Sequence, residues 1–172
     1  MNAKQLERLL TPFRVNPSAF DVVTRKLRES FSLATSGRGM NAHNLTIDET
    51  AWLLAAYAGS EVAAKAAETL KRLIPLQSDE KVNSGFLFNL QLILRGEITN
   101  VQEVRVCKNA DLAVIRYQDG TEVKFVRPEH LGEARGFGEA IYRSEGILTG
   151  GLLKTLAIEF ADGDAAGEFL GE

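Results

Sequence analysis

The spacing of apolar residues divides the chain into two parts. In the first part they recur every three or four positions, which is the period of an amphipathic helix. This pattern predicts helices at residues 2–10, 17–31, 47–58 and 61–74. The second part opens with the apolar run "FLFNLQLIL", which predicts a buried helix. Apolar and polar residues then alternate, and this period of two is typical of half-buried strands.

Polar residues at the helix starts support these assignments. Asn16 is a favourable N-cap, and Pro17 suits the first helical position. Thr46 and Glu49 have the spacing of a capping box, in which each side chain bonds to the backbone N–H of the other residue. Ser60 is expected to cap the helix over 61–74.

The alternating region predicts an antiparallel sheet. Three strands are expected, at about 102–107, 112–118 and 121–126. The turn signals "KNAD" and "QDG" separate them. A fourth strand is expected within 139–148, and a final helix opens after Thr149 with a stripe of leucines and a phenylalanine.

These elements predict an α+β protein in which an N-terminal helical bundle, a variant of the helix-turn-helix type, precedes a small antiparallel sheet with flanking helices. The connection from about Ser32 to Leu45 is longer than the turn of a standard helix-turn-helix. The expected parts are a helical domain at 1–76, a linker at 77–85, an α+β domain at 86–161 and an acidic flexible tail at 162–172.

Composition restricts the function classes. The 172 residues are 45% hydrophobic and 25% charged, which is usual for a globular protein. No apolar run approaches the ~20 residues that cross a bilayer, so we expect a cytoplasmic protein of a host cell that does not contact membranes. One cysteine and two histidines do not provide a common zinc framework, and Cys107 is expected to be a buried, inert thiol.

The sequence motifs do not indicate an enzyme. "GRGMNA" lacks the spacing of a dinucleotide-binding loop, and no strand leads into it. The segment Thr149-Gly150-Gly151 is explained by a helix cap. His130 has acidic neighbours but no nucleophile near it in sequence. We therefore predict no catalytic residue, no cofactor and no metal.

Charge is distributed unevenly along the chain. Residues 1–44 carry seven basic and three acidic side chains, a net charge of +4, whereas the remaining residues carry −7. Such an imbalance indicates that the N-terminal part is the one suited to a polyanion. Ordinary scatter of solvated surface charges explains the imbalance equally well.

Double-stranded DNA is the sharper candidate partner. A basic edge on the helix at 17–31 has the charge for phosphate contacts, and Arg38 lies between two glycines that let its backbone approach a surface closely. The predicted contacts are Arg25, Lys26, Arg28, Arg38, Asn41, His43 and Asn44. Two alternatives stay open: basic residues near a helix C-terminus also suit its dipole, and Arg38 can pair with an acid of its own bundle.

The other class of function that the sequence allows is a protein-binding module. The acidic second half could meet a basic surface on another protein. Its candidate residues are Glu97, Glu103, Asp111, Asp119, Glu122, Glu129, Glu133, Glu139 and Glu145.

Residues 26–56 resemble an N-terminal pattern in an uncharacterised family of phage and prophage proteins. In that pattern a helix ending in Leu-Arg-Glu leads to a Gly-Arg-Gly loop, and Leu/Met-Thr then opens a helix rich in alanine and leucine. The matching positions are Leu27-Arg28-Glu29, Gly37-Arg38-Gly39, Asn41-Ala42 and Leu45-Thr46, whereas Ser30-Phe31 departs from the usual Ala-Gly. The resemblance covers about a fifth of the chain. It implies a mobile-element origin and no particular activity.

Together these observations predict a phage- or prophage-derived DNA-binding regulator without catalytic activity, whose C-terminal part forms a homodimer or binds a partner. The alternative is a non-enzymatic inhibitor of a host defence system, similar to an anti-CRISPR protein, or a virion accessory protein.

Overall fold

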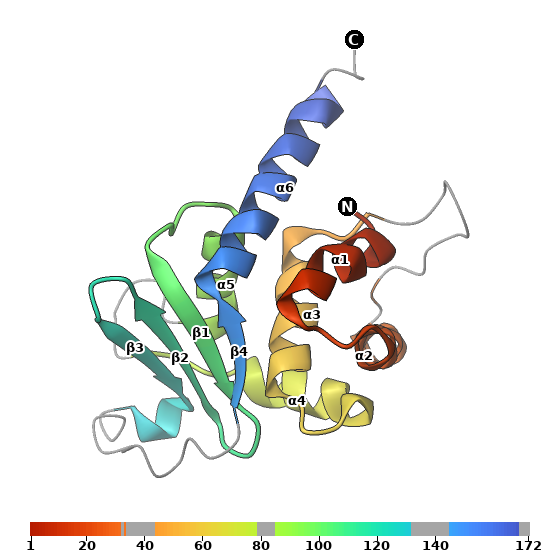
Figure 1. The fold of residues 1–172 in the computed structure, drawn as a ribbon. Coiled ribbons are helices and arrows are strands. Elements are labelled where there is room, and N and C mark those ends of the chain that lie inside the picture. Colours follow the sequence, from red (N-terminus) through yellow and green to blue (C-terminus); the bar gives the residue numbers. More distant parts are fainter. Residues whose placement is uncertain (32, 34–43, 79–84, 132–144, 169–172) are drawn as a thin grey trace.

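The computed structural model describes residues 1–31, 33, 44–78, 85–131 and 145–168, and Figure 1 shows helices followed by a sheet and a last long helix. The predicted α+β class is confirmed. The α-helices are α1 (Ala3–Leu10), α2 (Pro17–Phe31), α3 (Ile47–Gly59), α4 (Ala66–Leu73), α5 (Phe86–Leu94) and α6 (Gly150–Glu168). The short 3-10 helices are η1 (Thr11–Phe13), η3 (Ala63–Lys65) and η4 (Pro128–His130).

The predicted caps at the starts of α2 and α3 are confirmed. The Asn16 side chain accepts from the backbone N–H of Ala19 at 3.2 Å. At α3 the Thr46 hydroxyl accepts from the Glu49 N–H at 3.1 Å, and the Glu49 carboxylate accepts from the Thr46 N–H at 2.9 Å. These bonds satisfy N–H groups that a helix leaves without an internal partner.

Ser60 does not cap the start of the helix that follows it, so that prediction is wrong; it is instead the C-cap residue of α3. Its buried hydroxyl donates to the carbonyl of Ala56 at 2.6 Å and lies 3.1 Å from the hydroxyl of Thr69. The chain passes through η3 before α4 begins at Ala66, and that helix start has no side-chain cap. A hydroxyl that is drawn into the core in this way cannot also cap the segment that follows it.

The four strands form an antiparallel sheet in the order β3-β2-β1-β4. Their bounds are Val101–Cys107 (β1), Leu112–Tyr117 (β2), Glu122–Val126 (β3) and Glu145–Thr149 (β4). The three predicted strands are therefore confirmed. The expected fourth strand is confirmed from Glu145 on, whereas residues 139–144 lie outside the described residues. Gly120 adopts a left-handed φ of 86° in the predicted β2–β3 turn, a conformation that glycine takes without steric cost.

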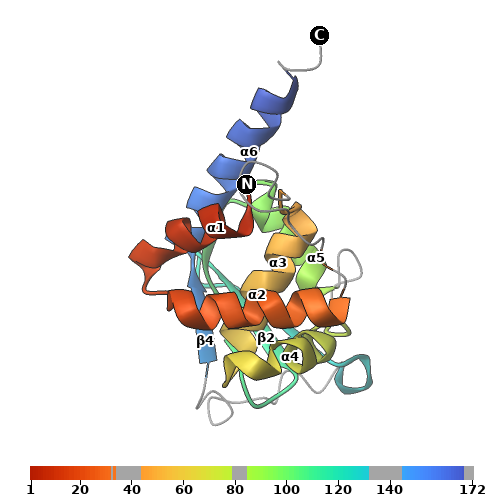
Figure 2. The same ribbon diagram turned by 90° about the vertical axis from the view of Figure 1, so that its right-hand side faces the viewer.

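Helices cover one face of the sheet. Central α3 contacts α2 and α4 on one side and α5, β1 and β4 on the other, while α6 packs on α5 and β1 (Figures 1 and 2). The inward side chains of the sheet include Val104, Ile115 and Phe125, all fully buried. They belong to one hydrophobic cluster with buried residues of α1 and α2, so the core is continuous from α1 to α6. The division into two domains at 77–85 stays a prediction.

Two glycines let α3 approach the sheet closely. A Cβ at Gly146 of β4 would lie 1.9 Å from the carbonyl oxygen of Ala58, which is far inside contact distance. A Cβ at Gly59 would lie 2.8 Å from Val106 and 2.9 Å from Thr69. At both positions the space of a Cβ atom is already occupied by neighbouring atoms. This close contact fixes the distance between the C-terminal end of α3 and the strands.

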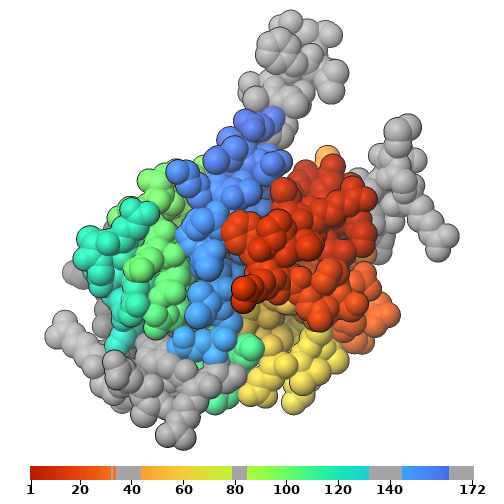
Figure 3. Space-filling view, in the orientation of Figure 1, coloured from red at the N-terminus to blue at the C-terminus, as the bar shows by residue number. Residues whose placement is uncertain are grey.

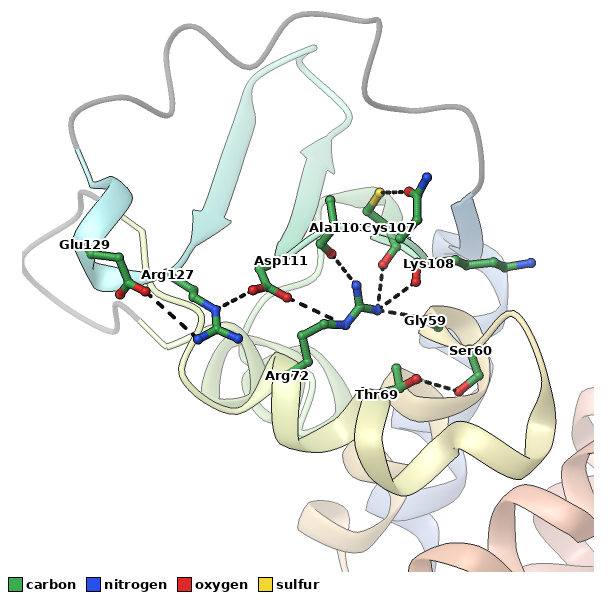
Figure 4. Close-up of polar contacts among 11 residues, drawn as sticks. Gly59, Ser60, Thr69, Arg72, Cys107, Lys108, Ala110, Asp111, Arg127 and Glu129 are labelled. Carbon is green, nitrogen blue, oxygen red and sulfur yellow. Dashed lines mark hydrogen bonds and ion pairs between the residues drawn. The ribbon is translucent and has the colours of Figure 1, made fainter.

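Arg72 of α4 joins the helices to the sheet (Figure 4). Its guanidinium donates to the carbonyls of Ala110 at 2.7 Å, Lys108 at 3.0 Å and Cys107 at 3.2 Å, all in or beside the turn between β1 and β2. It also donates to the carbonyl of Gly59 at the end of α3, at 3.3 Å. Asp111, 3.7 Å from the guanidinium, balances the charge and in turn pairs with Arg127.

The final helix is longer than the pattern predicts. It continues to Glu168, past the expected end at residue 161, and its C-terminal end extends away from the other elements (Figure 1). No helix in the described ranges is both long and apolar enough to span a membrane.

Replacing Arg72 with lysine should lower the free energy of unfolding by about 2 kcal/mol, because one ammonium cannot serve four carbonyls in this arrangement and partly buried carbonyls lose their partners. Urea denaturation measures the effect. Arg95→Lys is the matched control, because Arg95 is more exposed and its carboxylate partners lie at 4.0 Å. Equal losses in the two variants would contradict the role given to Arg72.

Gly146→Ala should destabilise the fold by about 2 kcal/mol or more, because the new methyl group meets a backbone carbonyl that cannot rotate away. Gly151→Ala is its control: a Cβ there meets nothing within 4 Å, and alanine favours the helix. Thermal unfolding followed by circular dichroism should show a large loss for the first variant and no loss for the second.

Candidate nucleic-acid interface

The predicted basic edge lies on α2, a helix on the outer side of the helical layer (Figure 2). Phe20, Val23 and Leu27 bury the opposite stripe of the helix in the core. Arg25 is exposed and Arg28 is half-buried. Their spacing of three places them on neighbouring turns of one side.

Lys26 differs from these two arginines. Its ammonium lies 2.7 Å from the Glu29 carboxylate, an ion pair one helical turn apart. The hydrogen bond from Lys26 holds the pKa of Glu29 below its usual range. Much of the charge of Lys26 is therefore already balanced, and its predicted role as a phosphate contact has the least support of the three α2 residues.

The arginines of the described chain fall into two groups. Five arginines outside the first helices each have a carboxylate within 4.0 Å, and they are Arg72, Arg95, Arg105, Arg116 and Arg127. The second group lies in the first two helices and the connection between them. Within the described residues, no carboxylate lies within 4.0 Å of a guanidinium of this group, which consists of Arg8, Arg14, Arg25 and Arg28. Guanidinium groups that are free of carboxylates are available to an external anion.

Asn44 lies apart from the α2 edge. It forms a bridge with Asn2, and the N–H of the next residue, Leu45, donates to the carbonyl of Met1 at 2.8 Å. Asn44 also lines a hollow of about 650 Å³ between α1 and α6, together with Arg8 and the carboxylates of Glu159 and Asp162. Two acidic groups beside Asn44 disfavour a phosphate there, so the structure does not group it with Arg25 and Arg28. The predicted contacts Arg38, Asn41 and His43 lie outside the described residues.

Arg14 was not among the predicted contacts. It follows η1 and holds a left-handed backbone, with φ 63° and ψ 24°. A non-glycine residue rarely takes this conformation. The preceding segment Thr11-Pro12-Phe13 gives a sequence signal for a turn, but it does not indicate which side chain the turn presents.

The outer face of the sheet carries a second cluster of charges, and it is internally balanced. The Glu103 carboxylate accepts from Arg105 at 2.8 Å and lies 3.4 Å from Arg116. Arg116 also donates to Glu122 at 2.7 Å. The predicted acidic surface for a basic partner is thus engaged with arginines of its own sheet at these positions. Glu133 and Glu139 lie outside the described residues.

Glu145 is the exception in this cluster. Its Oε1 atom is buried and has no hydrogen-bond partner among the described residues, and the guanidinium of Arg105 lies 4.0 Å from its carboxylate. Loss of hydration raises the pKa of Glu145, and the carboxylates of Glu103 and Glu122 add to this effect, while Arg105 and Arg116 oppose it.

Candidate catalytic groups stay dispersed. Cys107 is buried, as predicted, and lies 3.1 Å from the Asn109 side chain. The Thr149 hydroxyl accepts from the N–H of Leu152 at 3.4 Å, which agrees with a helix cap rather than an anion site. Among the described side chains, no group of three or more histidine, cysteine or acidic residues is arranged to hold a metal ion.

Comparison with known proteins adds no relative to this description. The chain matches no protein-family model, and searches of curated proteins and of solved structures found no similar protein.

Glu145→Gln should change the pH dependence of stability. A carboxyl group whose pKa is raised by folding binds its proton more tightly in the folded state, so its favourable contribution is complete at low pH and is lost as the pH rises through the raised pKa. The glutamine variant should therefore gain stability relative to the natural chain between pH 4 and pH 7, as measured by urea denaturation at each pH. Glu103→Gln should instead lose stability at pH 7, because it weakens two arginine contacts.

Proposed function

We propose that the chain is a non-catalytic protein that binds double-stranded DNA through α2, with Arg25 and Arg28 as phosphate contacts. The observation that carries the proposal is the division of the arginines. Arg72, Arg95, Arg105, Arg116 and Arg127 each have a carboxylate within 4.0 Å. In the described part of the chain neither Arg25 nor Arg28 has one that close, although Glu29 attracts Arg25 at longer range. Arginine presents several donors in a planar group, which suits phosphate oxygens.

The position of α2 supports this assignment. Its apolar stripe is fixed in the core, so the arginines project from a rigid element rather than from a free segment. Binding then needs little ordering of the backbone, which lowers the entropic cost of association. The predicted loop contacts Arg38, Asn41 and His43 follow α2 in the chain and remain part of the proposal, together with a regulatory role in a phage or prophage.

The proposed DNA contacts predict a steep dependence of affinity on salt. Fluorescence anisotropy with a labelled duplex of mixed sequence should show binding at 50 mM salt that weakens as salt is raised. The double variant Arg25→Gln/Arg28→Gln should lose about tenfold or more in affinity. It should also reduce the slope of log K against log salt by about 2, since each phosphate contact contributes about 0.9 for duplex DNA.

Arg95→Gln is the matched control for this experiment. Its side chain is 42% exposed and lies on the other side of α3, after α5. It should bind DNA like the natural chain. Arg38→Gln tests the loop separately. Absence of binding at 50 mM salt, or equal losses in the control and the double variant, would overturn the proposal.

A further inference from the structure

A hollow of about 340 Å³ lies between the N-terminal helices and the edge strand β4. Its buried floor comes from α2, α3, β4 and α6 and includes Val23, Leu54, Leu148 and Leu152. Figure 3 shows the N-terminal segment in red meeting the blue strand β4 along the front of the molecule. Pockets for small ligands are typically of about this size or larger, with apolar walls and a few polar groups.

Two large apolar side chains beside the hollow are open to solvent. Phe13 is 36% exposed and Ile147 is 52% exposed, and both line the hollow. Phe13 ends η1, whereas Ile147 of β4 pairs with Arg105 of β1, so its side chain stands on the outer face of the sheet at the rim of the hollow. Their exposure has a cost in water that an apolar ligand seated between them would remove.

The polar groups of the hollow favour a negative ligand. Arg14 and Lys108 line it, and within the described residues no carboxylate lies within 4 Å of either cation. Glu61 also lines the hollow, so its polar side chains carry a net positive charge. The Tyr57 hydroxyl accepts from the N–H of Asn16 at 3.0 Å and keeps its own proton for donation.

The backbone of Arg14 is a second, independent indication. A left-handed conformation is strained for a non-glycine residue, and such strain tends to gather at functional sites. Glycine or asparagine would hold this position with less strain. An arginine placed there brings a cation to the hollow at a cost in stability.

The hollow is formed by the fold before any ligand arrives. The close contact of Gly146 with Ala58 fixes β4 against α3, and both elements contribute walls. Tyr57 packs its ring at 5.8 Å from that of Phe20 in α2, which holds the third wall in place. A preformed site has little ordering cost on binding.

We propose that this hollow binds a small amphipathic carboxylate, with the apolar chain between Phe13 and Ile147 and the carboxylate at Arg14 and Lys108. The proposal is independent of DNA binding, because it rests on residues other than Arg25 and Arg28. The positive charge at the rim favours the carboxylate group of the ligand, and the exposed apolar walls favour its apolar chain.

Isothermal titration calorimetry with decanoate tests the proposal. The natural chain should bind one equivalent of decanoate, whereas decyltrimethylammonium, which has the same apolar chain and the opposite charge, should bind at least tenfold more weakly. Arg14→Asn should reduce decanoate affinity by about tenfold. Because asparagine tolerates the left-handed backbone, this variant should fold at least as stably as the natural chain.

A matched pair of isoleucines tests the apolar wall. Ile147→Asn should weaken decanoate binding, whereas Ile158→Asn should not, because Ile158 is equally exposed at 51% but lies in α6 away from the hollow. Arg25→Gln should bind decanoate normally even where it loses DNA. Failure of decanoate to bind, equal binding of the two probes, or equal affinity of Arg14→Asn and the natural chain would each overturn the proposal.

Discussion

The guanidinium of Arg72 is the contact on which the arrangement of the two layers depends. The last carbonyls of α3 have no partner within the helix, and further carbonyls are presented in and beside the β1–β2 turn. One side chain of α4 serves both sets at once, at Gly59 and at Cys107, Lys108 and Ala110. A cation also suits the C-terminal end of α3, where the helix dipole is negative. The helices and the strands are thus tied at one point, where both present carbonyl acceptors to the same guanidinium.

The position of β4 against α3 lies beside this point. With the end of α3 bound to the β1–β2 turn, Ala58 sits where only a glycine in β4 fits, and Gly146 occupies that place. The hollow next to β4 therefore follows from the same packing that sets the core. Phe13 of η1 and Ile147 of β4 are exposed at its rim because these two elements do not close over the hollow. A ligand that binds in the hollow would fill a space that the packing of the helices against β4 leaves open.

Sequence patterns predicted the parts of the fold that depend on near neighbours. The caps at Asn16 and Thr46 and the β2–β3 turn each rest on residues within four positions of one another, so their chemistry is visible in the chain. Ser60 was misassigned because its hydroxyl bonds to Thr69, nine residues ahead, as well as to Ala56. The contacts of Arg72 in the β1–β2 turn are 35 to 38 residues distant. Nothing local indicates them, and the hollow is made of four separated segments for the same reason.

The availability of charged side chains likewise depends on contacts that the local sequence does not show. The sequence predicted a basic edge from the composition of α2, but the availability of each cation depends on what surrounds it. Lys26 is paired with Glu29 at 2.7 Å, whereas in the described part of the chain no carboxylate lies within 4.0 Å of Arg25 or Arg28, and Glu29 attracts Arg25 only at longer range. The ion pairs of Arg95 are exposed and add little to stability. Pairing with carboxylates makes Arg95 and the four other paired arginines less attractive to an external anion than Arg25 and Arg28.

Helix α2 connects the two proposed sites. Ala19 and Val23 line the hollow, and Arg25 and Arg28 follow within the next turns of the same rigid helix. A helix moves as a unit, so a ligand that shifted its first turns would also shift the arginines. A ligand that bound without moving α2 would change DNA affinity only through its charge, and a carboxylate near the helix would then weaken the attraction of phosphates. The two mechanisms differ in salt dependence, because an effect of charge alone is screened at high salt, while displacement of the helix is not.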